Sequence, residues 1–298
     1  MLLSFLFCKK YATINITLGI KKGKGMKITV LGARGSVAVC GQKYTEYGGA
    51  TTCYLIETNG EAIFLDAGSG IMESPRISDK NVSIFLTHPH LDHLLGLPFF
   101  KELAEPEKKV VIYGMKRKLL SVKDQVDGVY SNPLWPVRMD EYPSHLVYTD
   151  LEGESEIKLS DATVSWIIGN HPGGSLIYKI VSGKKTIVFA TDYEHSAISD
   201  ERLIAFARDC DLLIYDGQYT WEEYNQKKGY GHSTMEHGVE IFKECNATQL
   251  LITHHDPWHT DGMLRNKEKE LQGKNNRIGF ARAGEVIEYE SNFQGKTD

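Results

Sequence analysis

Two successive series of short apolar segments restrict the possible folds of this 298-residue chain more than any other feature. The first series predicts strands at 27–31, 52–58, 62–66, 82–87 and 110–114 and a helix at 116–126. The second series repeats this order, with strands at 162–169, 175–181, 186–192, 211–217 and 249–255 and helices at 200–210 and 232–246. The repetition predicts an α/β fold in which two sheets pack face to face and helices cover their outer faces.

A single domain is expected over residues 26–298, because no linker, charge block or low-complexity tract interrupts them. Residues 1–25 begin apolar, but they lack the basic stretch and the small-residue cleavage site of a secretory signal. Met26 opens a well-formed strand directly after a stretch rich in lysine and glycine. We therefore expect residues 1–25 to be a disordered extension or the result of an overlong choice of start codon.

Charge and cysteine usage disfavour several classes of partner and compartment. The chain has 34 Lys and Arg against 39 Asp and Glu, a formal net charge of -5, which disfavours a large nucleic-acid partner. Its five cysteines are scattered and never spaced as CxxC, so a disulfide framework and a thiolate zinc site are not predicted. No apolar run approaches the roughly 20 residues of a membrane-spanning helix. A reduced, cytoplasmic protein without a membrane partner is expected.

The residues with the clearest chemistry lie between Thr87 and His93, directly after an apolar strand. Within this loop, three histidines and one aspartate occur together: His88, His90, Asp92 and His93. Imidazole and carboxylate ligands suit zinc, manganese or iron. A loop at a strand end can direct His88 and His90 to one cation, while Asp92 and His93 point to a second. Chance clustering in a polar loop is a poor explanation, because the whole chain holds only 11 histidines.

Three further strand ends carry candidate ligands. His171 follows one strand and is surrounded by turn residues, and Asp192 ends another, where its two oxygens could bridge two cations. A single aspartate at a strand end is more often the N-cap of a following helix. His254 and His255 end a third strand. Only one of these two adjacent histidines can point into a site.

Taken together, the HxHxDH loop and the later strand-end His, Asp and His resemble the metallo-β-lactamase-fold hydrolases, from Met26 to about Glu290. The resemblance implies an αββα sandwich with two divalent ions, zinc first and manganese as the alternative. It implies a first metal held by His88, His90 and His171, and a second held by Asp92, His93 and His254. Asp192 would bridge the two ions, and Asp66 would orient a ligand histidine.

Within that superfamily, the chain looks more like the phosphodiesterase branch. The zinc-site cysteine common in the β-lactam-hydrolysing members is replaced here by Asp192. The segment GHST at 231–234 is similar to the HxT motif by which tRNase Z-like enzymes place a histidine, here His232, beside the scissile phosphate. Ser233 and Thr234 could contact substrate, or could simply cap a helix. In addition, LGARGS, YGG and THHDP resemble enzymes that open cyclic phosphodiesters, among them cyclic-nucleotide phosphodiesterases and anti-Pycsar enzymes.

The resemblance therefore predicts a metal-dependent phosphodiesterase that hydrolyses a 3′,5′-cyclic nucleotide to its monophosphate by a metal-bridging hydroxide. Asp92 and His232 are the expected catalytic residues, with His232 donating to the phosphate or to the leaving oxygen. A tRNase Z-like endonuclease is the second candidate, although the long Gly/Pro-rich basic arm is missing from the sequence. A lactone or thioester hydrolase is the third, and a non-catalytic nucleotide-binding module is the fourth.

Several other residues remain open between two interpretations. The insert 127–143 could roof the active site, contact a second subunit of an expected homodimer, or be a surface loop anchored by its own aromatics. Tyr219, Trp221 and Tyr224 could stack on a base or form a buried cluster. We expect His145 and His237 to be solvated and His255 to have a structural role or to support the ligands. His195 and His259 receive no assignment.

Overall fold

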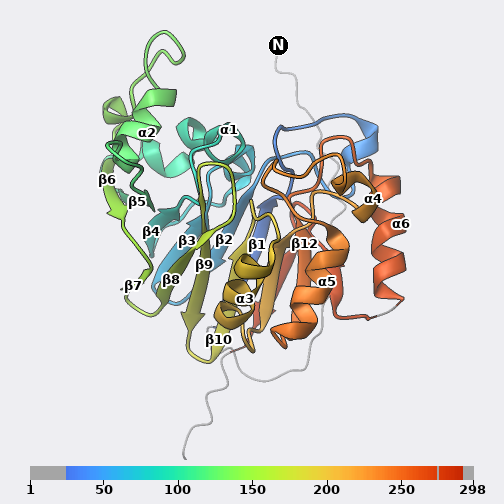
Figure 1. Cartoon of the computed structure of the whole chain (residues 1–298). Helices are drawn as coiled ribbons and strands as arrows, with labels where there is room; N and C mark the ends of the chain where they lie inside the picture. The colour runs from blue at the N-terminus through green and yellow to red at the C-terminus, as the bar shows by residue number, and fades with distance from the viewer. Residues whose placement is uncertain (1–24, 274, 291–298) are drawn as a thin grey trace, which may run out of the picture.

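The computed structural model describes residues 25–273 and 275–290, and two seven-stranded sheets form its centre (Figure 1). The predicted N-terminal extension lies outside the described residues, except for Gly25. In order, the first sheet contains β14 (Val286–Tyr289), β1 (Met26–Gly32), β2 (Cys53–Glu57), β3 (Glu61–Leu65), β4 (Asn81–Phe85), β5 (Lys109–Met115) and β6 (His145–Leu151). The second contains β13 (Ile278–Phe280), β12 (Gln249–Thr253), β11 (Leu212–Asp216), β10 (Lys185–Ala190), β9 (Ser175–Ser182), β8 (Thr163–Gly169) and β7 (Ser155–Lys158).

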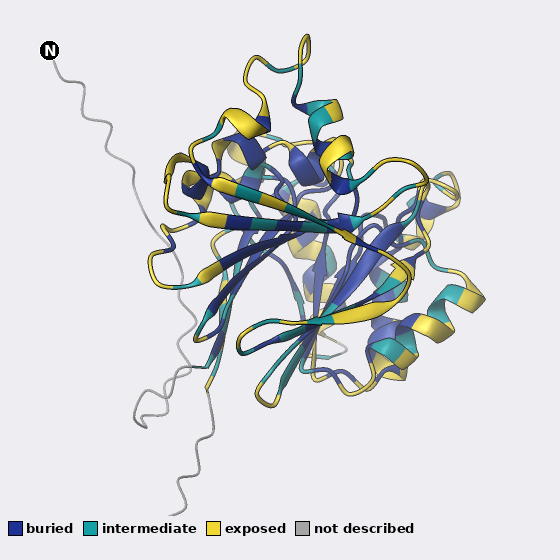
Figure 2. Cartoon of the chain, turned by 90° about the vertical axis from the view of Figure 1, so that its left-hand side faces the viewer, coloured by how far each residue is buried: buried dark blue, intermediate teal, exposed yellow. Residues whose placement is uncertain are grey.

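Helices cover the outer face of each sheet. The first sheet is covered by α1 (Leu91–Leu94), α2 (Val122–Val129) and short 3-10 turns, and the second by α3 (Ala197–Phe206), α5 (Met235–Glu244) and α6 (Asp261–Gln272), with the short α4 (Trp221–Tyr224) above it (Figure 1). One apolar core lies between the sheets, and two others lie beneath the helices. The inner strands are accordingly buried, while exposed residues gather on loop tips, outer helix faces and the edge strands β6, β7 and β14 (Figure 2). This layering confirms the predicted αββα sandwich.

Strand direction decides where the functional residues can meet. In the first sheet β3, β4, β5 and β6 run parallel, and in the second β10, β11, β12 and β13 do. β8 pairs antiparallel with β9, which pairs antiparallel with β10, so β8 shares their direction. Because parallel strands end at the same edge of a sheet, the segments that follow β3, β4, β8, β10, β11 and β12 come together at one edge of the sandwich.

The predicted helices exist, but capping residues move their starts. The helix expected at 116–126 begins at Val122, because Ser121 and Asp124 form a capping box there. The helix expected from Asp200 begins three residues earlier, after the cap Ser196. Thr234 caps α5 by accepting the backbone N–H of His237. Within the described residues, no helix is both long enough and apolar enough to cross a membrane.

Candidate metal-dependent active site

The chemistry-bearing residues all follow the carboxyl ends of neighbouring strands. Three of them have left-handed backbone conformations, with φ of 62° at Asp66, 54° at Asp192 and 60° at His254. Such values are uncommon outside glycine and cost of order 1–3 kcal/mol each, so the surrounding contacts must hold them. At His254 this conformation ends the extended strand and directs the ring to the same centre as Asp192, from which its nitrogen Nε2 is 3.4 Å away.

The structure brings the predicted ligands into two groups, and within each group the ligand atoms lie within 4.8 Å of one another. The first group is His88, His90 and His171, and the second is Asp92, His93 and His254. Asp192 lies between them. Its oxygen Oδ2 is 3.1 Å from Nε2 of His93, and its oxygen Oδ1 is 3.6 Å from Nε2 of His88.

Several ligand atoms are buried and lack hydrogen-bond partners, so they are available to bind cations. Nε2 of His88, His93 and His254 and Oδ2 of Asp192 are buried and have no hydrogen-bond partner. Leaving such groups unpaired is costly, because burial removes their hydrogen bonds to water. Nitrogen and carboxylate donors are the ligands of zinc and manganese. The residues present therefore fit divalent metal ions.

The other ring nitrogens of these histidines are occupied, which fixes how the rings point. Nδ1 of His93 is 2.7 Å from Oδ2 of Asp66, which is the contact predicted for that aspartate. Nδ1 of His254 is 3.0 Å from Oγ1 of Thr52. Since Nδ1 is engaged in both residues, each ring presents Nε2 to the centre. Outer partners of this kind orient metal-binding histidines and set their tautomer.

Burial and neighbouring charges set the protonation states. Burial lowers the pKa of His88 well below its ordinary value, so the ring is neutral. Burial acts to raise the pKa of Asp192, but His254, His93 and His88 outweigh it and hold that pKa well below the usual range. Neutral imidazole and ionised carboxylate are the forms that bind metal ions.

His232 pairs with Asp216, a residue that the sequence analysis did not single out. Its Nδ1 is 2.9 Å from Oδ2 of Asp216, the last residue of β11, and Oδ2 also accepts the backbone N–H of Asp192 at 2.8 Å. Burial acts to lower the pKa of His232, but Asp216 and then Asp192 outweigh it and raise that pKa. By distance, His232 also groups with His171 and Asp192 as a ligand candidate. However, Asp216 holds one of its nitrogens. The signal for Asp216 was available, because it ends a strand just as Asp192 does.

The GHST segment touches a metal-ligand candidate through its glycine. Nδ1 of His171 lies 2.8 Å from the carbonyl oxygen of Gly231. A Cβ at Gly231 would lie 2.2 Å from that same nitrogen, so no larger residue fits without a shift. Of the two other predicted residues in the segment, Thr234 caps α5, and Ser233 hydrogen-bonds to His195 at 2.8 Å. For Thr234 the structure thus favours the capping interpretation.

A buried arginine joins the three segments that resemble cyclic-phosphodiester-opening enzymes. Arg34, in LGARGS, is fully buried. Its Nε donates to the carbonyl of Gly48 in YGG at 2.8 Å, and its Nη1 donates to the carbonyl of Asp256 in THHDP at 3.0 Å. It also donates to the carbonyl of His259 at 2.7 Å. Arg34 therefore has a structural role at the base of the site.

Two histidine predictions need correction or refinement. His237 is not solvated: it is largely buried, its Nε2 is 3.0 Å from Asp200, and its ring stacks on His195 with centroids 4.2 Å apart. His145 is exposed, as expected. His255 does not face the centre, because its Nε2 donates to the carbonyl of Ala281 at 2.9 Å. Burial lowers the pKa of this ring to about 3.

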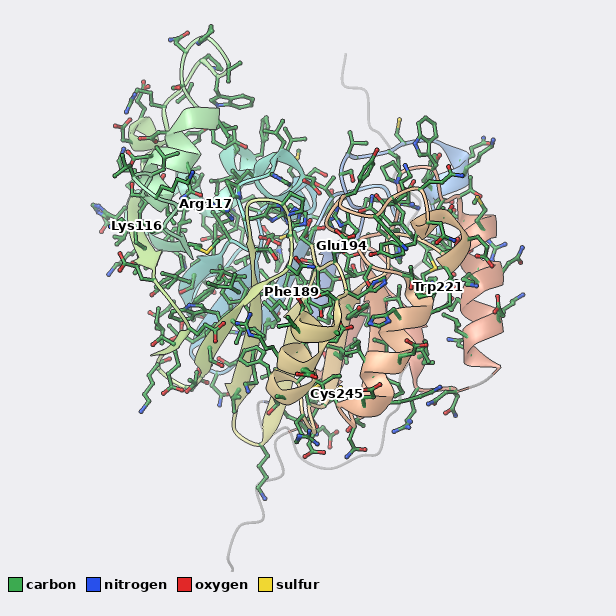
Figure 3. The ribbon with its side chains drawn as sticks, in the orientation of Figure 1. Lys116, Arg117, Phe189, Glu194, Trp221 and Cys245 are labelled. Carbon is green, nitrogen blue, oxygen red and sulfur yellow. The ribbon has the colours of Figure 1, made fainter. Side chains whose placement is uncertain are left out.

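The aromatic residues that the sequence left open, between a role in the site and a structural role, differ in their positions. Tyr224 is buried and away from the site, whereas Tyr219 is buried but lines the cleft above the ligands. Trp221 is half exposed on α4 (Figure 3). In the insert 127–143, Trp135 packs edge-on against Tyr130, with ring centroids 5.4 Å apart. The insert is thus anchored by its own aromatics, and its residue Val129 also lines the cleft.

Two groups of nitrogen and carboxylate donors on one edge of an αββα sandwich define a metal-dependent hydrolase of the metallo-β-lactamase fold. Residues 61–255 match the beta-lactamase superfamily domain, and the chain belongs to that family. It is 24% identical over 280 residues to the probable metallo-hydrolase YhfI of Bacillus subtilis (strain 168), covering 88% of this chain and 100% of that protein. The crystal structure of YhfI superposes with a TM-score of 0.68 at 20% identity, covering 89% of this chain and 100% of the other.

Two other proteins are similar to this chain, one in sequence and one in structure. Ribonuclease Z of Pyrococcus abyssi (strain GE5 / Orsay) is 27% identical over 251 residues, which cover 68% of this chain and 79% of that enzyme. Unliganded yeast PDE1 has a similar structure, with a TM-score of 0.60 and 17% identity, covering 90% of this chain and 100% of the other. The likeness to PDE1 shows the fold, whereas the family match, the metallo-hydrolase relative and the donor groups support a metal-dependent hydrolase.

Proposed function

We propose that the protein is a phosphodiesterase that opens a small cyclic phosphodiester, with a 3′,5′-cyclic nucleotide as its preferred substrate and a monophosphate as the product. One observation carries the proposal. His232, paired with Asp216, lines a cleft of about 590 Å³ together with the metal-ligand candidates Asp92, His171 and Asp192. This volume falls within the range of small-ligand sites, ~300 to 1,000 Å³.

The proposal assigns each group of donors to one cation. His88, His90 and His171 would hold the first ion, Asp92, His93 and His254 the second, and Asp192 both. When bound, two divalent ions provide a nucleophile from water at neutral pH and neutralise the phosphoryl oxygens. Zinc is the expected metal, because the donors are rich in imidazole, and manganese is the alternative.

The chain's own residues then position the reactants and supply the proton. Asp92 is held in place by the backbone N–H of Ser36, which donates to its Oδ2 at 2.8 Å. His232 has its Nδ1 engaged by Asp216, which leaves Nε2 to donate a proton to the leaving oxygen. The carboxylate of Asp216 favours the protonated imidazole that this step requires.

Two relatives support phosphodiester chemistry, and one of them favours a second candidate function. Yeast PDE1 is a phosphodiesterase-type neighbour in structure, and ribonuclease Z recurs among the sequence relatives. The second candidate is therefore an RNA-processing endonuclease. We rank it lower, because the net charge of -5 gives no general attraction for RNA phosphates. Lactone or thioester hydrolysis ranks below both, since neither gives the His232–Asp216 pair a phosphate to act on. The expected cytoplasmic location and homodimer stay predictions.

Metal content gives the first test. Protein loaded with zinc or manganese and then desalted is expected to contain about two divalent ions per chain, and a chelator should abolish its hydrolytic activity. Elemental analysis measures the content. His145→Ala is a matched control, because His145 is an exposed histidine away from both groups of donors. Only trace metal in the loaded wild-type protein would contradict the proposal.

Substrate preference gives the second test. The metal-loaded protein should hydrolyse 3′,5′-cyclic nucleotides with a higher kcat/KM than it cuts a precursor tRNA, because the cleft suits a mononucleotide. Both reactions are measured on one preparation, by chromatography of the monophosphate and by gel analysis of the RNA. Efficient 3′-end cleavage of the tRNA without cyclic-nucleotide turnover would instead establish the endonuclease function.

A further inference from the structure

The cleft beside the metal-ligand candidates has two walls, and the exposed ring of Tyr230 belongs to one of them. Pro89, Leu91 and Val129, from the first half of the chain, line one part of it, while Tyr219 and Tyr230, from the second half, line another. The first half contributes from α1, the loop before it and the end of α2, and the second half from the loops before and after α4; α1 and α4 lie on either side of the upper edge of the sheets (Figure 1). Tyr230 is 58% exposed and Leu91 is also 58% exposed. Apolar surface thus borders the metal-ligand candidates.

Tyr230 is exposed, yet its backbone is held on both sides by one carboxylate. Glu194 accepts the N–H of Gly229 at 2.6 Å through Oε1 and the N–H of Gly231 at 3.0 Å through Oε2. Both glycines have left-handed conformations, with φ of 85° and 92°. The N–H of Tyr230 itself donates to the carbonyl of Lys227 at 3.1 Å. A loop fastened at three consecutive residues presents its side chain in a defined direction.

The same carboxylate residue belongs to the framework of the site. Glu194 comes two residues after Asp192, and its backbone N–H donates to the carbonyl of Asn170, the neighbour of His171, at 2.8 Å. Gly231, beside Tyr230, accepts from Nδ1 of His171. Figure 3 shows Glu194 at the upper edge of the sheets, inward of Trp221. The position of the Tyr230 loop is therefore tied to the metal-ligand candidate His171.

A cation stands beside the ring. Nζ of Lys227 lies 5.4 Å from the ring centroid of Tyr230 and 5.7 Å from that of Tyr219. Cation–π contacts of this kind stabilise the position of an aromatic side chain, and with 58% of its surface exposed Tyr230 remains accessible to a ligand. The positive charge also favours an anionic ligand at the mouth of the cleft.

From this arrangement we infer that Tyr230 is a specificity-determining residue that stacks on the aromatic base of the substrate, with Glu194 as the residue that positions it. The inference rests on the proposed function and adds what the substrate carries besides its phosphodiester. The phosphate of a nucleotide and its base lie at opposite ends of the molecule. With the phosphate beside Asp92 and His232, the base reaches the mouth of the cleft, where Tyr230 and Leu91 offer apolar faces.

The assignment is tested by comparing the hydrolysis of a cyclic nucleotide with that of an analogue that lacks the nucleobase. Tyr230→Ala should raise KM for a 3′,5′-cyclic nucleotide roughly 5- to 100-fold, the range that loss of one stacked base corresponds to. kcat and metal content should change little. For the base-free analogue, methyl ribofuranoside 3′,5′-cyclic phosphate, KM should stay the same. Tyr230→Phe should restore KM, because the phenyl ring also stacks. Trp258→Ala, which removes an aromatic side chain that is 82% exposed and does not line the cleft, is the control.

A binding measurement separates this inference from the proposed function. Calorimetry with adenosine 5′-monophosphate and with ribose 5-phosphate requires no turnover. Wild-type protein should bind the nucleotide more tightly, and both Tyr230→Ala and Glu194→Gln should remove that advantage. If cyclic nucleotides are not hydrolysed but the advantage depends on Tyr230, the proposed function fails and the stacking assignment stands. Equal affinity for both probes in the wild type, or an equal rise in KM for base-bearing and base-free substrates, would overturn the assignment.

Discussion

Asp192→Ala is expected to abolish metal binding by both groups of ligands at once and to reduce phosphodiester hydrolysis to background. We propose that this carboxylate bridges the two groups, since it lies 3.1 Å from Nε2 of His93 and 3.6 Å from Nε2 of His88. Bound cations contribute several kcal/mol to the stabilisation of such a transition state. Their loss corresponds to on the order of 10³-fold or more in rate. Elemental analysis and rate measurements on the same sample check both parts.

Asp92→Ala is the matched control for the shared carboxylate. Among the metal-ligand candidates, Oδ2 of Asp92 lies near two members of the second group, His93 at 3.2 Å and His254 at 3.7 Å, and near none of the first group. This variant should therefore lose about half of the metal and keep the first group occupied. Thermal unfolding of both variants, together with the gentler Asp192→Asn, identifies any loss that comes from misfolding. Equal metal loss in folded Asp192→Ala and Asp92→Ala would disprove the bridging assignment.

The metal-ligand candidates could be predicted from sequence because each has a local signal. His88 to His93 stand together after a buried strand, and His171, Asp192 and His254 each follow another. Parallel strands bring such positions to one edge whatever the details of their packing. The sequence pattern and the topology together are therefore sufficient to bring the ligands together.

The orientation of individual side chains depended on distant contacts and could not be predicted. The residues alone left open whether His254 or His255 faces the centre, and only the family resemblance assigned His254. The answer lies in a left-handed backbone at His254 and in a hydrogen bond from its ring to Thr52, 202 residues away. His237 looked like a surface residue of a helix, yet Asp200 on α3 and the ring of His195 cover it. No local pattern carries this information.

Some elements could not be predicted because polar residues at buried positions interrupt their apolar pattern. α6 was not predicted, although Leu264, Glu268 and Leu271 form a buried stripe at helical spacing. Glu268 interrupts the apolar pattern. It is accommodated there because Tyr47 donates to its Oε2 at 2.7 Å and Arg282 donates to its Oε1 at 3.0 Å. Buried carboxylates need such partners, and these partners are more than 10 residues away in the sequence.

His232→Ala should distinguish phosphodiester chemistry from the other hydrolyses that this fold supports. If His232 donates a proton to the leaving oxygen and does not bind metal, the variant should keep its metal content. Its rate should fall on the order of 10²- to 10⁴-fold, the usual contribution of a positioned acid. Distance alone would also allow His232 to act as a ligand, because it groups with His171 and Asp192. A ligand would behave differently, since its loss should deplete metal and activity together.

Asp216→Asn is a second test of whether His232 acts as the acid. The carboxylate engages Nδ1 of His232 at 2.9 Å and favours the protonated ring, whereas an amide keeps the shape and loses the charge. If His232 acts as the acid, Asp216→Asn should lower kcat while metal content stays normal, and adding it to His232→Ala should cause little further loss, because the two residues act as one unit. Multiplicative losses in the double variant would mean that Asp216 acts independently, through the backbone N–H of Asp192. A folded His232→Ala variant with full metal content and near-normal phosphodiesterase activity would remove His232 from the reaction altogether.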